Sequence, residues 1–304
     1  MGEEQSLDRW LVEAGKRTLP LPEVIATPRD AATVVLVRDG SSGLEVFLLR
    51  RVPEMAFAAG MTVFPGGGVD AADDTDLDWS GPAAPWWAEK FDAEPLAARM
   101  LVVAAVRETF EECGVLLATG TDGRVPAREQ VAGDRAALVA KELSFGAFMR
   151  RRGLTLRADW LAPLAHWITP PVSARRYSTH FFLAALPDGQ EADGSTSEAS
   201  TSAWARPVDA LDAWSHGVHS LLPPTWARLR DLSRHPTVAE AFAAERVVEV
   251  VGEDELDDPY GMKFDGVDDY LAVFSRIAPP AGEVPAPPVE VRGRPATEPR
   301  NPSR

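Results

Sequence analysis

The sequence predicts an α/β protein in which a mixed β-sheet packs between helices. The first observation is a pair of β-rich runs at 32–38 and 44–50, and the second is a strongly periodic helix pattern over 96–113. The third is the order of later segments, because strand patterns at 160–169 and 177–186 precede several short helix patterns. A sheet with one long helix on one face and further helices behind it accounts for all three.

The composition and net charge of the chain disfavour several classes of partner. The chain has 304 residues and a formal net charge of -15, which disfavours nucleic acid and anionic membranes as partners because both would repel it. Cys113 is the single cysteine, so no internal disulfide forms, and we expect its thiol in the core. The sequence shows neither a leader pattern nor an apolar run of about 20 residues. We therefore expect a cytoplasmic protein, with a homodimer as one assembly state; the arginine and alanine bias is typical of GC-rich bacterial genomes.

We interpret residues 30–277 as one domain preceded by an N-terminal arm over 1–29. Residues 70–95 are acidic and rich in proline and tryptophan, which indicates an insertion within the domain. Residues 278–304 are rich in proline and poor in apolar side chains, and this pattern predicts a disordered tail.

The first elements follow from local patterns. The runs 32–38 and 44–50 flank the turn-forming segment 39–43, so they predict an antiparallel hairpin. Residues 61–64 predict a short third strand, and the glycines at 66–68 follow it. Glycines at these positions allow positive φ and a close approach of the backbone to a ligand.

The long predicted helix carries three glutamates on one face. At 100° per residue, Glu108, Glu111 and Glu112 lie together and apolar side chains occupy the opposite face. Arg107 lies one turn before Glu111 and is expected to hydrogen-bond it, and Gly114 is expected to end the helix. One interpretation is a solvated helix face with an internal ion pair. The other is a site for a hard divalent cation, since such ions prefer oxygen ligands; the chain lacks the cysteine and histidine spacing of a zinc site.

Two segments together support the second interpretation. Residues 107–115, Arg-Glu-Thr-Phe-Glu-Glu-Cys-Gly-Val, and 64–67, Phe-Pro-Gly-Gly, resemble the two halves of the Nudix box. Thr109 replaces the family's usual aliphatic residue, and an insertion separates the halves. Eight residues before Arg107, where the family has a further glutamate, this chain has Arg99. The resemblance implies an α/β/α sandwich and hydrolysis of a diphosphate bond with Mg²⁺ or Mn²⁺.

The resemblance also assigns roles to individual residues. It implies a late glutamate outside the helix, for which we choose Glu198, six residues before Trp204. The implied metal ligands are Glu108, Glu111, Glu112 and Gly67, the implied catalytic residues are Arg107, Glu108, Glu112 and Glu198, and the implied substrate contacts include Gly66 and Gly67.

Residues 60–67, with Leu48 and Arg51 before them, are similar to the signature of the coenzyme A diphosphatase branch. That branch implies coenzyme A or acyl-CoA as substrate and 3′,5′-ADP and (acyl-)4′-phosphopantetheine as products. Arg51, Arg175 and Arg176 are then candidate contacts to substrate phosphate. Other nucleoside diphosphate derivatives (ADP-ribose, NADH, dinucleoside polyphosphates) remain alternatives, because Ala56 departs from the signature. A non-catalytic nucleotide sensor is a further alternative, because Arg99 stands where the family has its first glutamate.

The rest of the chain predicts supporting elements. We expect a strand at 115–118, one helix over 128–151, a polar loop over 188–202, a helix at 207–215 and an edge strand at 247–251. The tryptophans of the insertion are expected to pack as a lid, with stacking on a substrate base as the alternative. His166 and His180 flank strand centres, and we expect structural roles for both.

Overall fold

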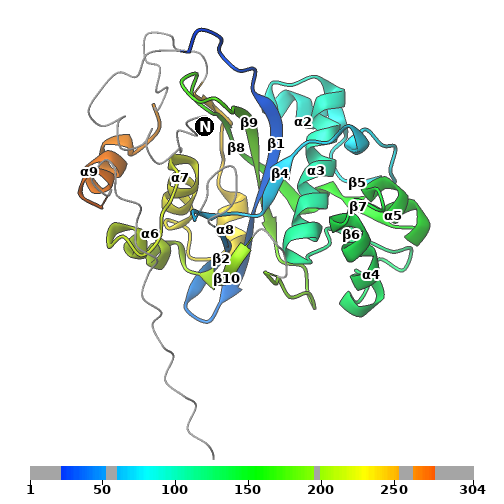
Figure 1. Cartoon of the computed structure of the whole chain (residues 1–304). Helices are drawn as coiled ribbons and strands as arrows, with labels where there is room; N and C mark the ends of the chain where they lie inside the picture. The colour runs from blue at the N-terminus through cyan, green and yellow to red at the C-terminus, as the bar shows by residue number, and fades with distance from the viewer. Residues whose placement is uncertain (1–21, 53–59, 195–198, 253–262, 278–304) are drawn as a thin grey trace, which may run out of the picture.

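The structure, a computed structural model, describes residues 22–52, 60–194, 199–252 and 263–277. Figure 1 shows a central sheet with one group of helices on each face. The predicted α/β class with a mixed sheet between helices is confirmed. The residues 1–21 of the expected arm and the whole expected tail lie outside the described residues.

The main sheet has the strand order β10-β2-β1-β9-β8-β11, with β3 paired to β2 and β4 paired to β1. It is mixed, because β1 pairs with β9 and β8 with β11 in parallel while the other pairs are antiparallel. A small second sheet has the order β5-β7-β6. The strands are β1 (Arg29–Gly40), β2 (Gly43–Arg51), β3 (Thr62–Val63), β4 (Gly66–Gly68), β5 (Trp79–Ser80), β6 (Ala118–Thr119), β7 (Thr155–Arg157), β8 (Leu161–Ile168), β9 (Tyr177–Ala185), β10 (Ala199–Ala205) and β11 (Val250–Val251).

Alternation along the strands creates the two helical layers. Val34 and Leu36 of β1 belong to a core shared with α2, α3, α4 and α5, whereas Val35 and Val37 belong to a core shared with α6, α7, α8 and α9. Within the described residues, no helix is long and apolar enough to span a membrane. The helices are α2 (Ala84–Phe91), α3 (Pro95–Cys113), α4 (Arg128–Val139), α5 (Phe145–Arg152), α6 (Pro207–Ser215), α7 (Pro223–Leu232), α8 (Val238–Ala243) and α9 (Val267–Ile277), with short 3₁₀ turns η1 (Ala71–Asp73) and η2 (Ala158–Trp160).

The predicted hairpin is present. β1 and β2 pair antiparallel, with Val37 opposite Val46 and Gly40 opposite Gly43 at the turn. Gly43 has φ +116°, a conformation that side chains with a Cβ rarely adopt.

The glycines at 66–68 do not use the positive φ that glycine allows. They form β4, pair antiparallel with β1, and have no positive φ. Glycine is needed at Gly66 for space, because a Cβ there would lie 2.5 Å from the carbonyl oxygen of Ala32 and 2.7 Å from Cα of Thr33. The close approach that glycine allows is therefore made to the protein's own strand.

Several later elements differ from their prediction. The helix expected over 128–151 is two helices, α4 and α5, and β10 begins at Ala199 where we expected loop. The alanine and serine content of β10 gives little strand signal, and its pairing with β2 makes it a strand. Arg151 and Arg152 of α5 form ion pairs with Asp134 of α4 and so join the two helices.

The expected insertion has defined structure. It contains η1, β5 and α2, and Trp87 of α2 is fully buried. The ring of Trp87 lies 5.9 Å from that of Phe91 and 5.5 Å from that of Phe182 on β9, centroid to centroid. The expected packing of a tryptophan against the domain is confirmed at this residue, whereas Trp86 is 38% exposed.

Candidate active site

Helix α3 positions the three predicted carboxylates. It begins at Pro95 and ends as predicted at Gly114, which adopts φ +71°. Arg107, Glu111 and Glu112 are only 6%, 7% and 7% exposed. A solvated helix face would expose them, so that interpretation of the charged run is wrong.

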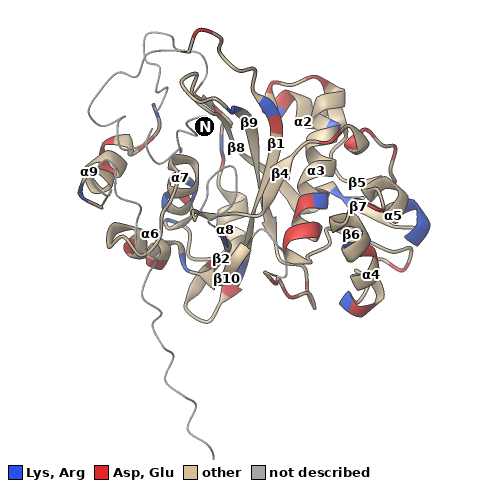
Figure 2. Ribbon diagram, viewed as in Figure 1, with Lys and Arg blue, Asp and Glu red and all other residues tan. Residues whose placement is uncertain are grey.

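The glycine strand β4 meets this helix. The backbone N–H of Gly66 donates to Oε2 of Glu112 at 2.8 Å. A Cβ added at Gly67 would lie 2.5 to 2.8 Å from the carboxylate atoms of Glu108. Figure 2 shows acidic residues at the C-terminal half of α3, beside β4. The structure thus brings together the two segments whose combination carried the family resemblance.

We expect Gly67→Ala to abolish hydrolytic activity and to destabilise the fold by about 1–3 kcal/mol, because the added methyl group displaces the Glu108 carboxylate. Activity and thermal unfolding measure the two effects. Gly133→Ala on α4 is the matched control, since a Cβ there meets nothing within 4 Å. The control should retain activity and gain about 0.5–1 kcal/mol. Full activity in Gly67→Ala would show that the close approach has no function.

Arg107 has a different main partner from the predicted one. Its Nε and Nη2 donate to the two carboxylate oxygens of Asp73 at 2.8 and 2.9 Å. Nη2 also donates to the carbonyl of Gly68 at 2.9 Å, and Nη1 donates to Glu108 at 2.6 Å. The expected partner Glu111 lies 3.6 Å away, beyond hydrogen-bonding distance. Burial alone would lower the pKa of Arg107, but the hydrogen bond and the charges of its carboxylate neighbours hold that pKa above its usual value.

Asp73 is the site residue that the sequence analysis missed. Its side chain is 1% exposed and lies in η1, inside the expected insertion. A capping box places it, because Asp73 accepts from the backbone N–H of Asp70 at 2.8 Å while Asp70 accepts from Ala72. The Asp-x-x-Asp spacing was the available signal. Arg99, which occupies the position of the family's further glutamate, pairs with Asp74 at 2.5 Å.

The three glutamates differ in their nearest partners. Burial raises the pKa of Glu108, with Glu111 as a further cause, and the charge of Arg107 acts in the opposite direction. Glu111 lies 3.2 Å from Nζ of Lys141, and Glu112 accepts from Gly66. No group of three histidine, cysteine, aspartate or glutamate side chains in the described ranges is arranged as a ready-made metal site.

The donor set nevertheless fits a divalent cation. Asp73, Glu108 and Glu111 contact two cations, Arg107 and Lys141, and Glu112 of the same helix accepts from the N–H of Gly66, so four carboxylates stand against two cations. Buried carboxylates with excess negative charge favour a counter-ion, and oxygen-only donors suit a hard one. Glu108, Glu111 and Glu112 are the residues that would hold it.

The other predicted site residues lie on elements other than α3 and β4 or outside the described residues. Arg51 ends β2 opposite Ala199, and its backbone N–H donates to Met61 at 2.9 Å. Arg176 is buried and donates to the carbonyls of Thr169 at 2.7 Å and Ala26 at 3.1 Å, which gives it a structural role. Arg175 is exposed in the same turn. Substrate contacts by Arg51, Arg175 and Arg176 stay predictions, and Glu198 lies outside the described residues.

His166 and His180 lie in the sheet interior. Their rings stack at 3.8 Å, and burial lowers the pKa of His166 to about 4 and that of His180 to about 3. Both are neutral at physiological pH, which agrees with the expected structural roles. Cys113 is buried, and burial raises the pKa of its thiol, so it is a core residue as expected.

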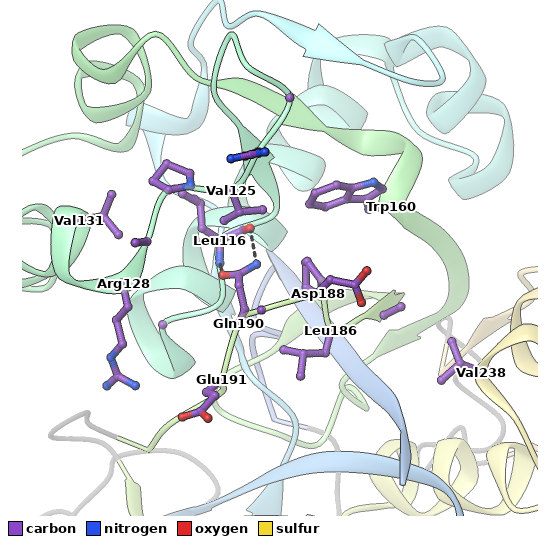
Figure 3. Close-up of a pocket in the computed structure, with 18 of the residues that line it drawn as sticks. Leu116, Val125, Arg128, Val131, Trp160, Leu186, Asp188, Gln190, Glu191 and Val238 are labelled. Atoms are coloured by element: carbon purple, nitrogen blue, oxygen red, sulfur yellow. Dashed lines mark hydrogen bonds between the residues drawn. The ribbon is translucent and has the colours of Figure 1, made fainter.

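A large cavity lies beside the end of α3. Its volume is about 1110 Å³, and Gly114, Leu116, Trp160 and Gln190 contribute to its wall. Figure 3 shows the side chain of Gln190 paired with the backbone of Leu116, at 2.8 Å to its N–H and 3.0 Å to its carbonyl. None of the predicted site residues lines this cavity, so the carboxylate site and the cavity are different features of the described structure.

Fold and site together define an α/β/α protein with a carboxylate-rich helix packed against a glycine strand. Comparisons with known proteins agree. The NUDT19 Nudix domain profile matches residues 88–232. A crystal structure of a NUDIX hydrolase from Alicyclobacillus acidocaldarius superimposes with a TM-score of 0.62 at 27% identity and covers 74% of this chain and 100% of that chain.

Sequence relatives point the same way. The putative nudix hydrolase 7 of Caenorhabditis elegans is 30% identical over 212 residues, which cover 70% of this chain and 63% of that protein. The acyl-coenzyme A diphosphatase NUDT19 of Gallus gallus is 25% identical, with 73% of this chain and 72% of the relative covered. The chain thus spans less than two thirds of the C. elegans relative. The chain is thus similar in sequence and fold to Nudix hydrolases and, among them, to the coenzyme A diphosphatase branch.

Proposed function

We propose that the protein hydrolyses the pyrophosphate linkage of coenzyme A or acyl-CoA to 3′,5′-ADP and (acyl-)4′-phosphopantetheine, with Mg²⁺ or Mn²⁺ as cofactor. The observation that carries the hydrolase proposal is the contact between β4 and the carboxylates of α3. Members of the family generally use divalent metal ions. The substrate proposal is supported by relatives that are named acyl-coenzyme A diphosphatase.

The residues of the site have separable tasks. Glu108, Glu111 and Glu112 would hold the cation, which when bound supplies electrophilic stabilisation of the phosphoryl oxygens. Arg107 and Asp73 fix the rotamer of Glu108, because the guanidinium donates to both carboxylates. The N–H of Gly66 orients Glu112. These contacts make Arg107 a positioning residue.

A substrate panel tests the proposal. Coenzyme A, an acyl-CoA, ADP-ribose, NADH and a dinucleoside polyphosphate are compared in kcat/KM with Mg²⁺ and with Mn²⁺, and the products are identified by mass spectrometry. We expect the coenzyme A species to give the highest kcat/KM and to yield 3′,5′-ADP. Preference for ADP-ribose would overturn the substrate assignment and leave the hydrolase assignment intact.

The same panel distinguishes a nucleotide sensor. The reason for that alternative was that Arg99 stands where the family has its first glutamate. In the structure, Asp73 supplies a carboxylate to Arg107. Nucleotide binding without metal-dependent turnover of any panel member would establish the sensor and overturn the proposed hydrolysis.

A further inference from the structure

Lys141 has an unusual backbone for its residue type. It follows the last turn of α4 and has φ +58°, and among the described residues Asp92 is the other non-glycine residue with positive φ. Its N–H donates to the carbonyl of Leu138 at 2.8 Å, which closes the helix. Glycine is the usual residue at such a helix end, because a Cβ is strained there. Strain of this kind points to a function for the side chain.

The side chain reaches the carboxylate site. Nζ of Lys141 lies 3.2 Å from one carboxylate oxygen of Glu111, and Nη1 of Arg107 lies 3.6 Å from the other. The side chain of Glu111 is 9% exposed, whereas that of Lys141 is 67% exposed. An ammonium group has three donors, and because the Lys141 side chain is largely exposed, the contact with Glu111 leaves donors accessible from solvent.

Arg107, the other cation of the site, already uses its hydrogen-bond donors in contacts within the protein. The Arg107 side chain is 7% exposed, and it donates to Asp73, to the carbonyl of Gly68 and to Glu108. Breaking these contacts to bind a phosphate would leave buried charges without partners. Besides the proposed divalent cation, a protein cation that contacts a diphosphate substrate must therefore be a residue other than Arg107.

We propose that Lys141 binds the phosphate oxygens of the diphosphate substrate and that Glu111 orients its ammonium group for this contact. The proposal rests on the proposed function, because it assigns a substrate contact within that site. Exposure explains the choice of side chain: the Lys141 ammonium group is accessible to a substrate from solvent, whereas the buried Arg107–Asp73 pair keeps the carboxylates in place.

Lys141→Gly separates this role from a structural one, because the two predict opposite results. If Lys141 only closes the helix, glycine relieves strain, raises Tm by about 2 °C and leaves the kinetics unchanged. If Lys141 binds phosphate, the same variant raises Tm but also raises KM by about tenfold, with a smaller change in kcat. Lys141→Asn tolerates the same backbone and should lose affinity similarly, while Lys141→Arg keeps the charge and should recover part of it.

Asp92→Gly is the matched control, since it relieves positive φ at the end of α2 without touching the carboxylates. It should raise Tm and leave KM unchanged. The readout that does not depend on turnover is calorimetric binding of inorganic pyrophosphate in the presence of Mg²⁺. We expect about tenfold weaker binding in Lys141→Gly than in the wild type or in Asp92→Gly.

The outcomes separate this proposal from the proposed function. Equal pyrophosphate affinity in the wild type and Lys141→Gly, or no binding by either, overturns the role of Lys141. If the wild type hydrolyses no panel substrate but Lys141→Gly binds pyrophosphate more weakly, Lys141 is a phosphate-binding residue and the proposed hydrolysis fails.

Discussion

Replacing Glu112 by glutamine is expected to lower turnover by about 100-fold or more while the fold persists. The substitution removes a negative charge that we assign to cation binding, and each tenfold loss in rate corresponds to about 1.4 kcal/mol of lost transition-state stabilisation. Glutamine keeps an oxygen that accepts the hydrogen bond from Gly66, so we expect a change in stability within about 1 kcal/mol. Steady-state kinetics and thermal unfolding measure the two quantities on one preparation.

Glu89→Gln is the control for this substitution. Glu89 lies on α2 with a side chain 75% exposed and only a distant contact with Lys90, so its replacement should leave both quantities unchanged. Wild-type turnover in Glu112→Gln would contradict the assignment of this carboxylate to the reaction.

Asp73→Asn is expected to destabilise the protein by about 3–5 kcal/mol. The substitution replaces the bidentate carboxylate of a buried ion pair by a neutral amide, and removing one charged partner of a buried pair is strongly unfavourable even though Glu108 still contacts the guanidinium of Arg107. Because Arg107 also positions Glu108, turnover should fall together with stability. Denaturant unfolding gives the free energy, and the assay at a temperature where both proteins are folded gives the rate.

The neighbouring residue supplies the control for this second substitution. Asp74 pairs with Arg99, but the two side chains are 49% and 30% exposed, so Asp74→Asn should change stability by less than about 1 kcal/mol. If the two substitutions change stability by similar amounts, burial does not make the Asp73–Arg107 pair stronger than the exposed Asp74–Arg99 pair. If Asp73→Asn is as stable as the wild type, the Asp73–Arg107 pair does not stabilise the contact between the expected insertion and α3.

The elements that the sequence predicted correctly have strong local signals. The hairpin of β1 and β2 has alternating strands and a glycine turn, and α3 has a long helical period that ends at Gly114. Weak local signals gave errors, because tertiary contacts decide such segments: β10 is serine-rich, and the break between α4 and α5 is stabilised by ion pairs to Asp134.

The sequence predicted the individual glutamates of the site but not the contacts that they make in the folded chain. The spacing of Glu108, Glu111 and Glu112 placed them on one face of a helix, yet it could not show that the face is buried against β4. Counting eight residues back from Arg107 leads to Arg99 on the same helix, which pairs with Asp74. The main partner of Arg107 is Asp73, which lies near the start of the expected insertion. Only folding brings these two distant residues together.

The central claim is that the carboxylates of α3 hold a divalent cation, and calorimetric titration of Mn²⁺ into metal-free protein tests it most directly. We expect the wild type and Glu89→Gln to bind Mn²⁺ alike and Glu112→Gln to bind it at least about tenfold more weakly, since a ligand charge next to Glu108 and Glu111 is lost. Equal Mn²⁺ affinity in all three proteins, or no binding by the wild type, would contradict the claim.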